Sequence, residues 1–241
     1  MIPDPVEEAG LESFPASDPP AWSHAAETPR RPRTVLVSDV GSGPGQATAR
    51  AFAAAGWNVI GGLRRPASGT PVVAADNVLL VRLDVTDSDS IDASLQSGVD
   101  RFGSIDVVVN IAACAPALPF ASTPAEQIAE SFAAHVLGIM KLAKAAIPRL
   151  RAGGGGTIVN VGLAASVPSR ETALVLRAGE LALERFFASQ ADELARNAVA
   201  VVFVGGDDRA PSADGSRLRR PAGPEALADL VFHAATHRSA W

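Results

Sequence analysis

Tyrosine is absent from this chain of 241 residues, and Cys114 is its only cysteine. A single cysteine cannot form an internal disulfide, so the sequence is typical of a reducing compartment and we expect a cytoplasmic protein. No apolar run reaches the roughly 18 residues that a membrane-spanning helix needs, and the acidic, proline-rich N-terminus is unlike a signal peptide. Basic residues are outnumbered by acidic ones. The net charge of −5 argues against nucleic acid or an anionic membrane as a partner.

The remaining composition suits one folded domain and a tail. Hydrophobic residues make up 47% of the chain, which is enough for a full core. Residues 1–33 carry seven prolines among acidic and small residues and show no hydrophobic period. We therefore predict a disordered acidic tail over residues 1–33 and one domain over residues 34–241.

The domain opens with a strand, a glycine-rich turn, an alanine-rich helix and a second strand, over residues 34–65. Glycines allow the backbone of such a turn to approach a phosphate, and the N-terminus of the following helix presents free N–H groups to that anion. Ser42, Gly43 and Gly45 are the candidates for this contact. The pattern predicts the first βαβ unit of a dinucleotide-binding sheet, although a purely structural turn is the alternative.

Further strands and helices alternate along the rest of the domain. We predict strands over residues 77–83, 105–110, 157–162 and 199–204, and helices over residues 90–102, 124–150, 171–195 and 224–236. This alternation predicts an α/β fold: a doubly wound parallel sheet of the Rossmann type, with about six strands and helices on both faces.

The order and spacing of these elements resemble the short-chain dehydrogenase/reductase (SDR) family. The family's TGxxxGxG motif aligns with residues 38–45; the last two glycines are Gly43 and Gly45, and the first is replaced by Asp39. Aspartate tolerates left-handed backbone angles, so we expect the turn to persist. A carboxylate about 5 Å from a pyrophosphate costs about 3 kcal/mol at an effective dielectric near 20, which weakens binding by about two decades.

The resemblance implies a nicotinamide dinucleotide as cofactor. In that family, a basic residue just after the second strand pairs with the 2′-phosphate of NADP. Arg64 and Arg65 stand at this place and therefore favour NADP(H) over NAD. The alternative interpretation is that they are two surface arginines. The implied cofactor-binding residues are Ser42, Gly43, Gly45, Arg64, Arg65, Asp84, Val85 and Asn110. No metal site is predicted.

The residues that carry the family's chemistry are replaced. The motif YxASKAAL aligns with residues 176–183, so the catalytic tyrosine becomes Leu176 and the lysine becomes Glu180. The catalytic serine aligns with Leu163 and the helical asparagine with His135. Leucine has no proton to donate to a carbonyl, and no tyrosine elsewhere can replace the missing one. We therefore do not expect the family's standard carbonyl reduction.

Three functions remain open. The first is a non-catalytic member, a pseudoenzyme that acts as a structural or regulatory subunit. The second is an NADP(H)-dependent oxidoreductase or NADP(H) sensor with an atypical site. The third is a non-redox lyase, dehydratase or isomerase in which His135 and Glu180 move protons.

Partners are expected along two helices. Members of the resembling family commonly dimerise through helices equivalent to residues 124–150 and 171–195, so we expect a homo-oligomer or a hetero-oligomer with an intact relative. Residues 207–221 are too few for the family's substrate lid and are predicted to form a loop. The family's last strand is predicted to be missing.

Overall fold

The structure is a computed structural model that describes residues 31–65, 75–111, 120–162, 174–205, 217–218 and 223–236. Apart from residues 31–33, the predicted tail lies outside these ranges. Cys114 and Leu163 also lie outside them.

Seven parallel strands of the described chain form one sheet, in the order β3-β2-β1-β4-β5-β6-β7. The strands are β1 Thr34–Val37, β2 Asn58–Leu63, β3 Val78–Arg82, β4 Val107–Ile111, β5 Gly156–Val161, β6 Val199–Val204 and β7 Arg217–Leu218. The six longer strands and their parallel pairing confirm the predicted doubly wound sheet.

The short strand β7 corrects the prediction of a plain loop over residues 207–221. Arg217 pairs with Phe203 of β6, and Leu218 pairs with Val204. Two residues are too few to show a hydrophobic period, so the sequence carries no signal for this strand. Because β7 precedes the last helix, it does not replace the family's last strand; residues 237–241, which follow that helix, lie outside the described ranges.

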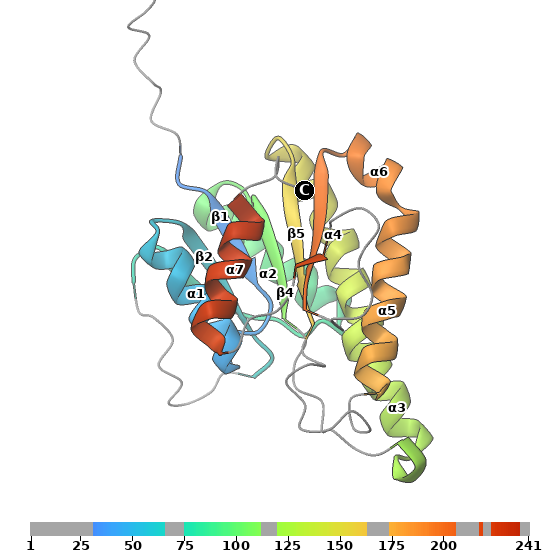
Figure 1. Cartoon of the computed structure of the whole chain (residues 1–241). Coiled ribbons are helices and arrows are strands. Elements are labelled where there is room, and N and C mark those ends of the chain that lie inside the picture. Colours follow the sequence, from blue (N-terminus) through green and yellow to red (C-terminus); the bar gives the residue numbers. More distant parts are fainter. Residues whose placement is uncertain are drawn as a thin grey trace, which may run out of the picture. The chain divides into compact units, whose positions relative to one another are not determined.

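Helices cover both faces of the sheet (Figure 1). Helices α1 Gly43–Ala54 and α7 Pro224–Thr236 pack on one face, where Val35 and Val37 of β1 point. Helices α2 Ser88–Phe102, α4 Gly138–Ala152 and α5 Leu174–Ser189 pack on the other face, where Leu36 points. Both faces of the central strands are therefore buried, which explains their continuous apolar sequences.

Strand β1 lies between β2 and β4, at the point where the order of the strands reverses. The connections after β1 and after β4 lead to opposite faces of the sheet, and this divergence creates a crevice at the carboxyl ends of the strands. The glycine-rich turn after β1 and the ends of β2, β3, β4 and β5 all lie at this edge.

The two helices predicted along the partner face are both interrupted. Residues 124–150 form α3 Ala125–Phe132, a π-helical turn Ala133–Leu137 and then α4. Residues 171–195 contain α5 and a separate short helix, α6 Ala191–Arg196, after a break at Gln190. A π-helical turn keeps the apolar pattern of a helix, so periodicity alone cannot reveal it.

Candidate functional site

The turn after β1 is closed by its own side chains. The backbone N–H of Gly41 donates a hydrogen bond to Oδ1 of Asp39, at 3.0 Å. Ser42 is the N-cap of α1: its Oγ accepts from the N–H of Gly45 at 3.2 Å and donates to the carbonyl of Asp39 at 3.2 Å. Gly45 is required because a Cβ there would overlap the carbonyl oxygen of Asp39.

Asp39 keeps this turn without left-handed backbone angles. Among the described residues, Ala198 is the only non-glycine residue with a positive φ. The expected left-handed conformation of Asp39 is therefore wrong; the residue fits because its carboxylate caps Gly41. The N–H group of Gly41 therefore already has a negatively charged partner from the chain itself.

The residues predicted to hold the adenine end lie at the carboxyl ends of β2 and β3. Arg64 and Arg65 are exposed just after β2. Oδ1 of Asp84 accepts from the backbone N–H of Thr86 at 3.0 Å and from its Oγ1 at 2.7 Å. The hydrogen bonds from Thr86 hold the pKa of Asp84 below its usual value, against the opposing effect of burial, and the charges of Arg64 and Arg82 lower it further.

The loop after β3 also contacts α4. A Cβ at Gly138 would come within 2.7 Å of a methyl group of Val85, so this glycine lets the helix lie directly against the loop. Nζ of Lys141 donates to the carbonyl of Thr86 at 2.9 Å. The predicted adenine loop and α4, which directly follows the π-helical turn of His135, are therefore in contact.

Asn110, at the end of β4, is paired with a residue that sequence reasoning missed. Its Nδ2 donates to Oδ1 of Asn160 on β5 at 2.8 Å, and the two residues are register partners. Asn110 is 1% exposed and Asn160 is 3% exposed. Within the described residues, Oδ1 of Asn110 and Nδ2 of Asn160 have no hydrogen-bond partner. The signal in the sequence is a polar residue at the same place in two adjacent apolar strands.

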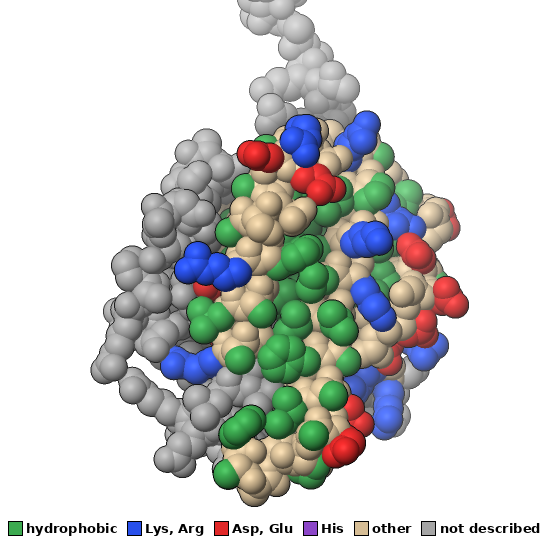
Figure 2. Space-filling model, turned by 90° about the vertical axis from the view of Figure 1, so that its right-hand side faces the viewer, with side chains coloured by type: hydrophobic (Ala, Val, Ile, Leu, Met, Phe, Trp, Pro, Cys, Tyr) green, Lys and Arg blue, Asp and Glu red, His purple; other side chains and the backbone are tan. Residues whose placement is uncertain are grey.

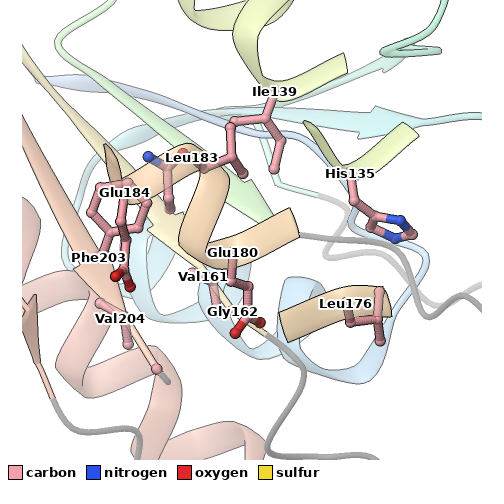
Figure 3. Close-up of a pocket in the computed structure, with 12 residues that line it drawn as sticks. His135, Ile139, Val161, Gly162, Leu176, Glu180, Leu183, Glu184, Phe203 and Val204 are labelled. Atoms are coloured by element: carbon pink, nitrogen blue, oxygen red, sulfur yellow. The ribbon is translucent and has the colours of Figure 1, made fainter. Parts of the chain in front are cut away.

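A pocket lies at the carboxyl ends of β5 and β6, against α5 (Figure 3). Its volume is about 30 Å³, which is room for one or two water molecules. The lining residues come from the π-helical turn, α4, β5, β6 and α5: His135, Ile139, Asn160, Val161, Gly162, Leu176, Glu180, Leu183, Glu184, Phe203, Val204 and Gly205. The pocket thus brings His135, Leu176 and Glu180 together, and Leu163 lies outside the described residues.

His135 is buried and is held by its own helix. Its Nδ1 lies 2.8 Å from the carbonyl oxygen of Ser131, one turn earlier. Because a carbonyl oxygen only accepts, Nδ1 carries the proton of this bond. Figure 3 shows the imidazole pointing away from the carboxylate of Glu180. The two residues line one pocket, but their functional groups do not face each other.

Glu180 and Gly162 fit each other closely. A Cβ at Gly162 would lie 2.6 Å from Oε1 of Glu180, so the carboxylate rests against the bare Cα at the end of β5. Leu176, one turn before Glu180 on α5, is buried. The position of the family's proton donor is therefore an apolar wall of the pocket.

The parallel sheet has a crevice where its strand order reverses, and a glycine-rich turn precedes α1. Together these features define a dinucleotide-binding class of protein. The family model for short chain dehydrogenase matches residues 33–206, and the chain belongs to this family. A protein named as ketoacyl reductase 2 of the granaticin polyketide synthase of Streptomyces violaceoruber is 32% identical over 227 residues. The alignment covers 86% of this chain and 91% of that protein.

Two solved structures have the same fold. A short-chain dehydrogenase from Streptomyces avermitilis superposes with a TM-score of 0.70 at 27% identity, covering 86% of this chain and 85% of that one. A 3-ketoacyl-(acyl-carrier-protein) reductase from Brucella melitensis, complexed with NADH, has a TM-score of 0.70 at 22% identity, covering 85% of this chain and 90% of that one. Within the described residues, no helix is long and apolar enough to cross a membrane, and no three potential ligand side chains gather as a metal site would require.

Proposed function

We propose that this chain is a non-catalytic member of the short-chain dehydrogenase family that acts as a structural or regulatory subunit. One observation carries the proposal. Leu176 and Glu180, at the aligned positions of the family's tyrosine and lysine, line the pocket, and the chain has no tyrosine.

The chemical reason is the lack of an acid. Proton donation to the carbonyl oxygen contributes about 10²–10⁴ to the rate of such reactions. A leucine cannot donate a proton, and the carboxylate of Glu180 would raise rather than lower the pKa of a neighbouring acid. His135 already uses Nδ1 within its helix.

The face proposed to meet a partner is formed by α4, α5 and the π-helical turn between α3 and α4. Figure 2 shows hydrophobic side chains gathered on this side of the molecule, with Lys and Arg side chains among them. Leu137 and Leu181 are 54% and 52% exposed there. Exposed large apolar side chains on neighbouring elements are typical of an interaction surface. The proposed partner is a second copy or an intact relative.

A turnover assay tests the proposal. The purified chain is incubated with NADPH or NADH and a series of ketones and ketoacyl thioesters, and cofactor consumption is followed by absorbance. We expect no oxidation above the rate without protein. Stoichiometric reduction of any ketone by the wild-type chain would overturn the proposal.

A second candidate, an NADP(H)-binding oxidoreductase or sensor, is favoured by the adenine end of the crevice. The capped turn before α1, the exposed Arg64 and Arg65, and Asp84 lie along one edge of the sheet. NADPH fluorescence titration separates the candidates: saturable binding tighter than about 100 µM favours the second. The third hypothesis, proton transfer by His135 and Glu180, has no support from their orientation, and His135→Ala tests it once a substrate is in hand.

A further inference from the structure

We propose that the face formed by α4, α5 and the π-helical turn binds a different subunit, one whose matching surface is acidic, and that it does not bind a second copy of this chain. The inference rests on the proposed function, because it identifies the partner of that same face. The sign of the exposed charges, their lack of ion-pair partners and the symmetry of a pairing between identical copies support it.

The exposed charges of this face are all positive. The sequence of α4 has four basic residues and no acidic one. Lys141, Lys144 and Arg151 of this helix are exposed, and so is Arg185 of α5. The whole chain has a net charge of −5, so composition alone would favour an acidic surface. The face is therefore a basic region of an acidic protein, and it attracts a partner of the opposite charge.

The acidic residues of α5 lie on another side of that helix. Glu180 and Glu184 are partly buried and line the pocket at the carboxyl ends of β5 and β6. Figure 3 shows both carboxylates directed toward these strands. In Figure 2, hydrophobic and basic side chains occupy the middle of the view, and acidic side chains lie toward its edges. The carboxylates of α5 thus point to the pocket and not to the surface that a partner would meet.

Three of the four exposed cations have no carboxylate of their own. Within the part of the chain that the structure describes, Lys144, Arg151 and Arg185 form no ion pair. By contrast, a guanidinium nitrogen of Arg149, also on α4, lies 3.2 Å from Oδ1 of Asp92 on α2. Carboxylates from a partner would pair with the three cations, and a bidentate pair with an arginine would also fix the orientation of the partner.

Apolar side chains lie among the cations. Leu137 and Leu181 are 54% and 52% exposed, and Pro148 is exposed between Lys144 and Arg151 along α4. The exposed positions of α4 follow the spacing of three and four residues that defines one side of a helix. A partner can therefore bury apolar area and pair charges over the same surface, as specific interfaces do.

Two identical copies would repel each other across this face. A twofold interface places the same surface on both sides, so the cations of one copy would meet the cations of the other. Exposed carboxylates of the adjoining helices α3 and α6 precede and follow the face in the chain: Glu126, Glu130, Asp192 and Glu193. Like charges across an interface weaken a pairing, and opposite charges stabilise it. The charge of the face therefore selects a different subunit.

The test uses a charge-reversed copy of the chain as the acidic probe. The variant Lys144→Glu/Arg151→Glu/Arg185→Glu keeps the apolar residues of the face and makes it acidic. In sedimentation velocity at about 50 mM salt, wild type alone should have a mass of 24.7 kDa, and an equimolar mixture with the variant should form a complex of twice that mass. The mixture should associate at least about 10-fold more tightly than wild type with itself, and about 500 mM salt should weaken this association.

A second variant controls for the overall change of charge. Arg50→Glu/Arg82→Glu/Arg101→Glu reverses three exposed cations on α1, β3 and α2, and it changes the net charge by the same amount. It should form no complex with wild type. If the acidic variant does not fold, as judged by circular dichroism, Lys144→Glu/Arg185→Glu replaces it, with Arg50→Glu/Arg101→Glu as the control.

Four results would overturn the proposal. They are wild type that associates with itself as tightly as with the acidic variant, no complex in the mixture, the same complex with the control variant, or binding of wild type to phosphatidylserine vesicles that the acidic variant loses, which would assign the face to a membrane. A homo-oligomer of wild type would refute this inference and leave the proposed structural role standing. Ketone reduction by wild type would refute the proposed function without changing these masses, so the two failures are distinguishable.

Discussion

A single carboxylate makes the turn after β1 negatively charged, at the place where a dinucleotide pyrophosphate is predicted to lie. Asp39 occupies a position that is glycine in the family motif, and its Oδ1 holds the N–H of Gly41. We propose that an incoming phosphate would have to displace this oxygen and approach its charge. At the scale of one residue, Asp39 would then compete with the cofactor.

Removing only the charge of Asp39 tests this role. Asp39→Asn keeps an acceptor for Gly41 but removes a repulsion of about 3 kcal/mol, so NADPH binding should tighten by up to about 100-fold. Because Asp39 is partly exposed, salt reduces the gain. The measurement is NADPH fluorescence at low and high salt. Asp192→Asn, on α6 at the opposite edge of the sheet, is the control. If Asp39→Asn binds NADPH with the same Kd as wild type, the charge of Asp39 does not affect NADPH binding.

Asp84 makes stability depend on pH in the acidic range. Its pKa is lower in the folded chain than the ordinary value of 3.8, because of the hydrogen bonds from Thr86 and the charges of Arg64 and Arg82. A lowered folded-state pKa stabilises the protein above the unfolded-state pKa, and this stability is lost as the pH falls through the folded-state value. Asp84→Asn should therefore be less stable than wild type at pH 7.

Urea denaturation at neutral pH and near pH 3 measures this difference. The gap between wild type and Asp84→Asn should shrink at the lower pH, because the unfolded chain then binds a proton at Asp84 and the stabilisation declines. Thr86→Val removes one hydroxyl donor and should reproduce part of the loss. A gap that is the same at both pH values would show that packing, not ionisation, is responsible.

At the scale of elements, α5 and β5 are adapted to each other at one contact. The carboxylate of Glu180 rests against the Cα of Gly162, so a side chain at position 162 would have to displace it.

Gly162→Ala should destabilise the fold by no more than about 1 kcal/mol, because the new methyl group displaces only the carboxylate end of the flexible Glu180 side chain. Combining it with Glu180→Ala should recover part of this loss, a coupling that a double-mutant cycle measures by chemical denaturation. Gly43→Ala is the matched control, since a Cβ there meets no atom within 4 Å. Strictly additive effects of the two changes would argue against the contact.

For the whole molecule, the main question is assembly. Leu137 and Leu181 expose large apolar surface on neighbouring elements. Burying the exposed half of each of them would contribute about 1 kcal/mol. We propose that this surface joins two chains, either identical copies or this chain and an intact relative.

Leu181→Glu should disrupt such an assembly. Light scattering after size exclusion should show wild type at a multiple of 24.7 kDa, or bound to a co-expressed relative, and the variant at 24.7 kDa. Leu80→Glu changes a comparably exposed leucine, 46% exposed on edge strand β3, and should not change the mass. A wild-type chain that is monomeric and binds no relative would contradict the proposal.

Most of the fold was predictable because it depends on local patterns. The apolar runs, the glycine turn and the helix periods predicted six strands at the right places in the chain, and Asp87 is the N-cap of α2 as an aspartate before a helix suggests. The π-helical turn was missed because one extra residue in a turn leaves the hydrophobic pattern almost unchanged. The break at Gln190 was missed as well, since no glycine or proline marks it in the sequence.

The sequence alone determined that no tyrosine is present to donate a proton. It also determined that Glu180 lies one helical turn after Leu176, and that Asp39 precedes α1. Only the tertiary structure decided which distant atoms meet: Asn110 with Asn160, and Glu180 with Gly162. The physical reason is that the sheet register and the close approach of α5 bring together residues 18 to 50 positions apart, and local spacing carries no record of such contacts.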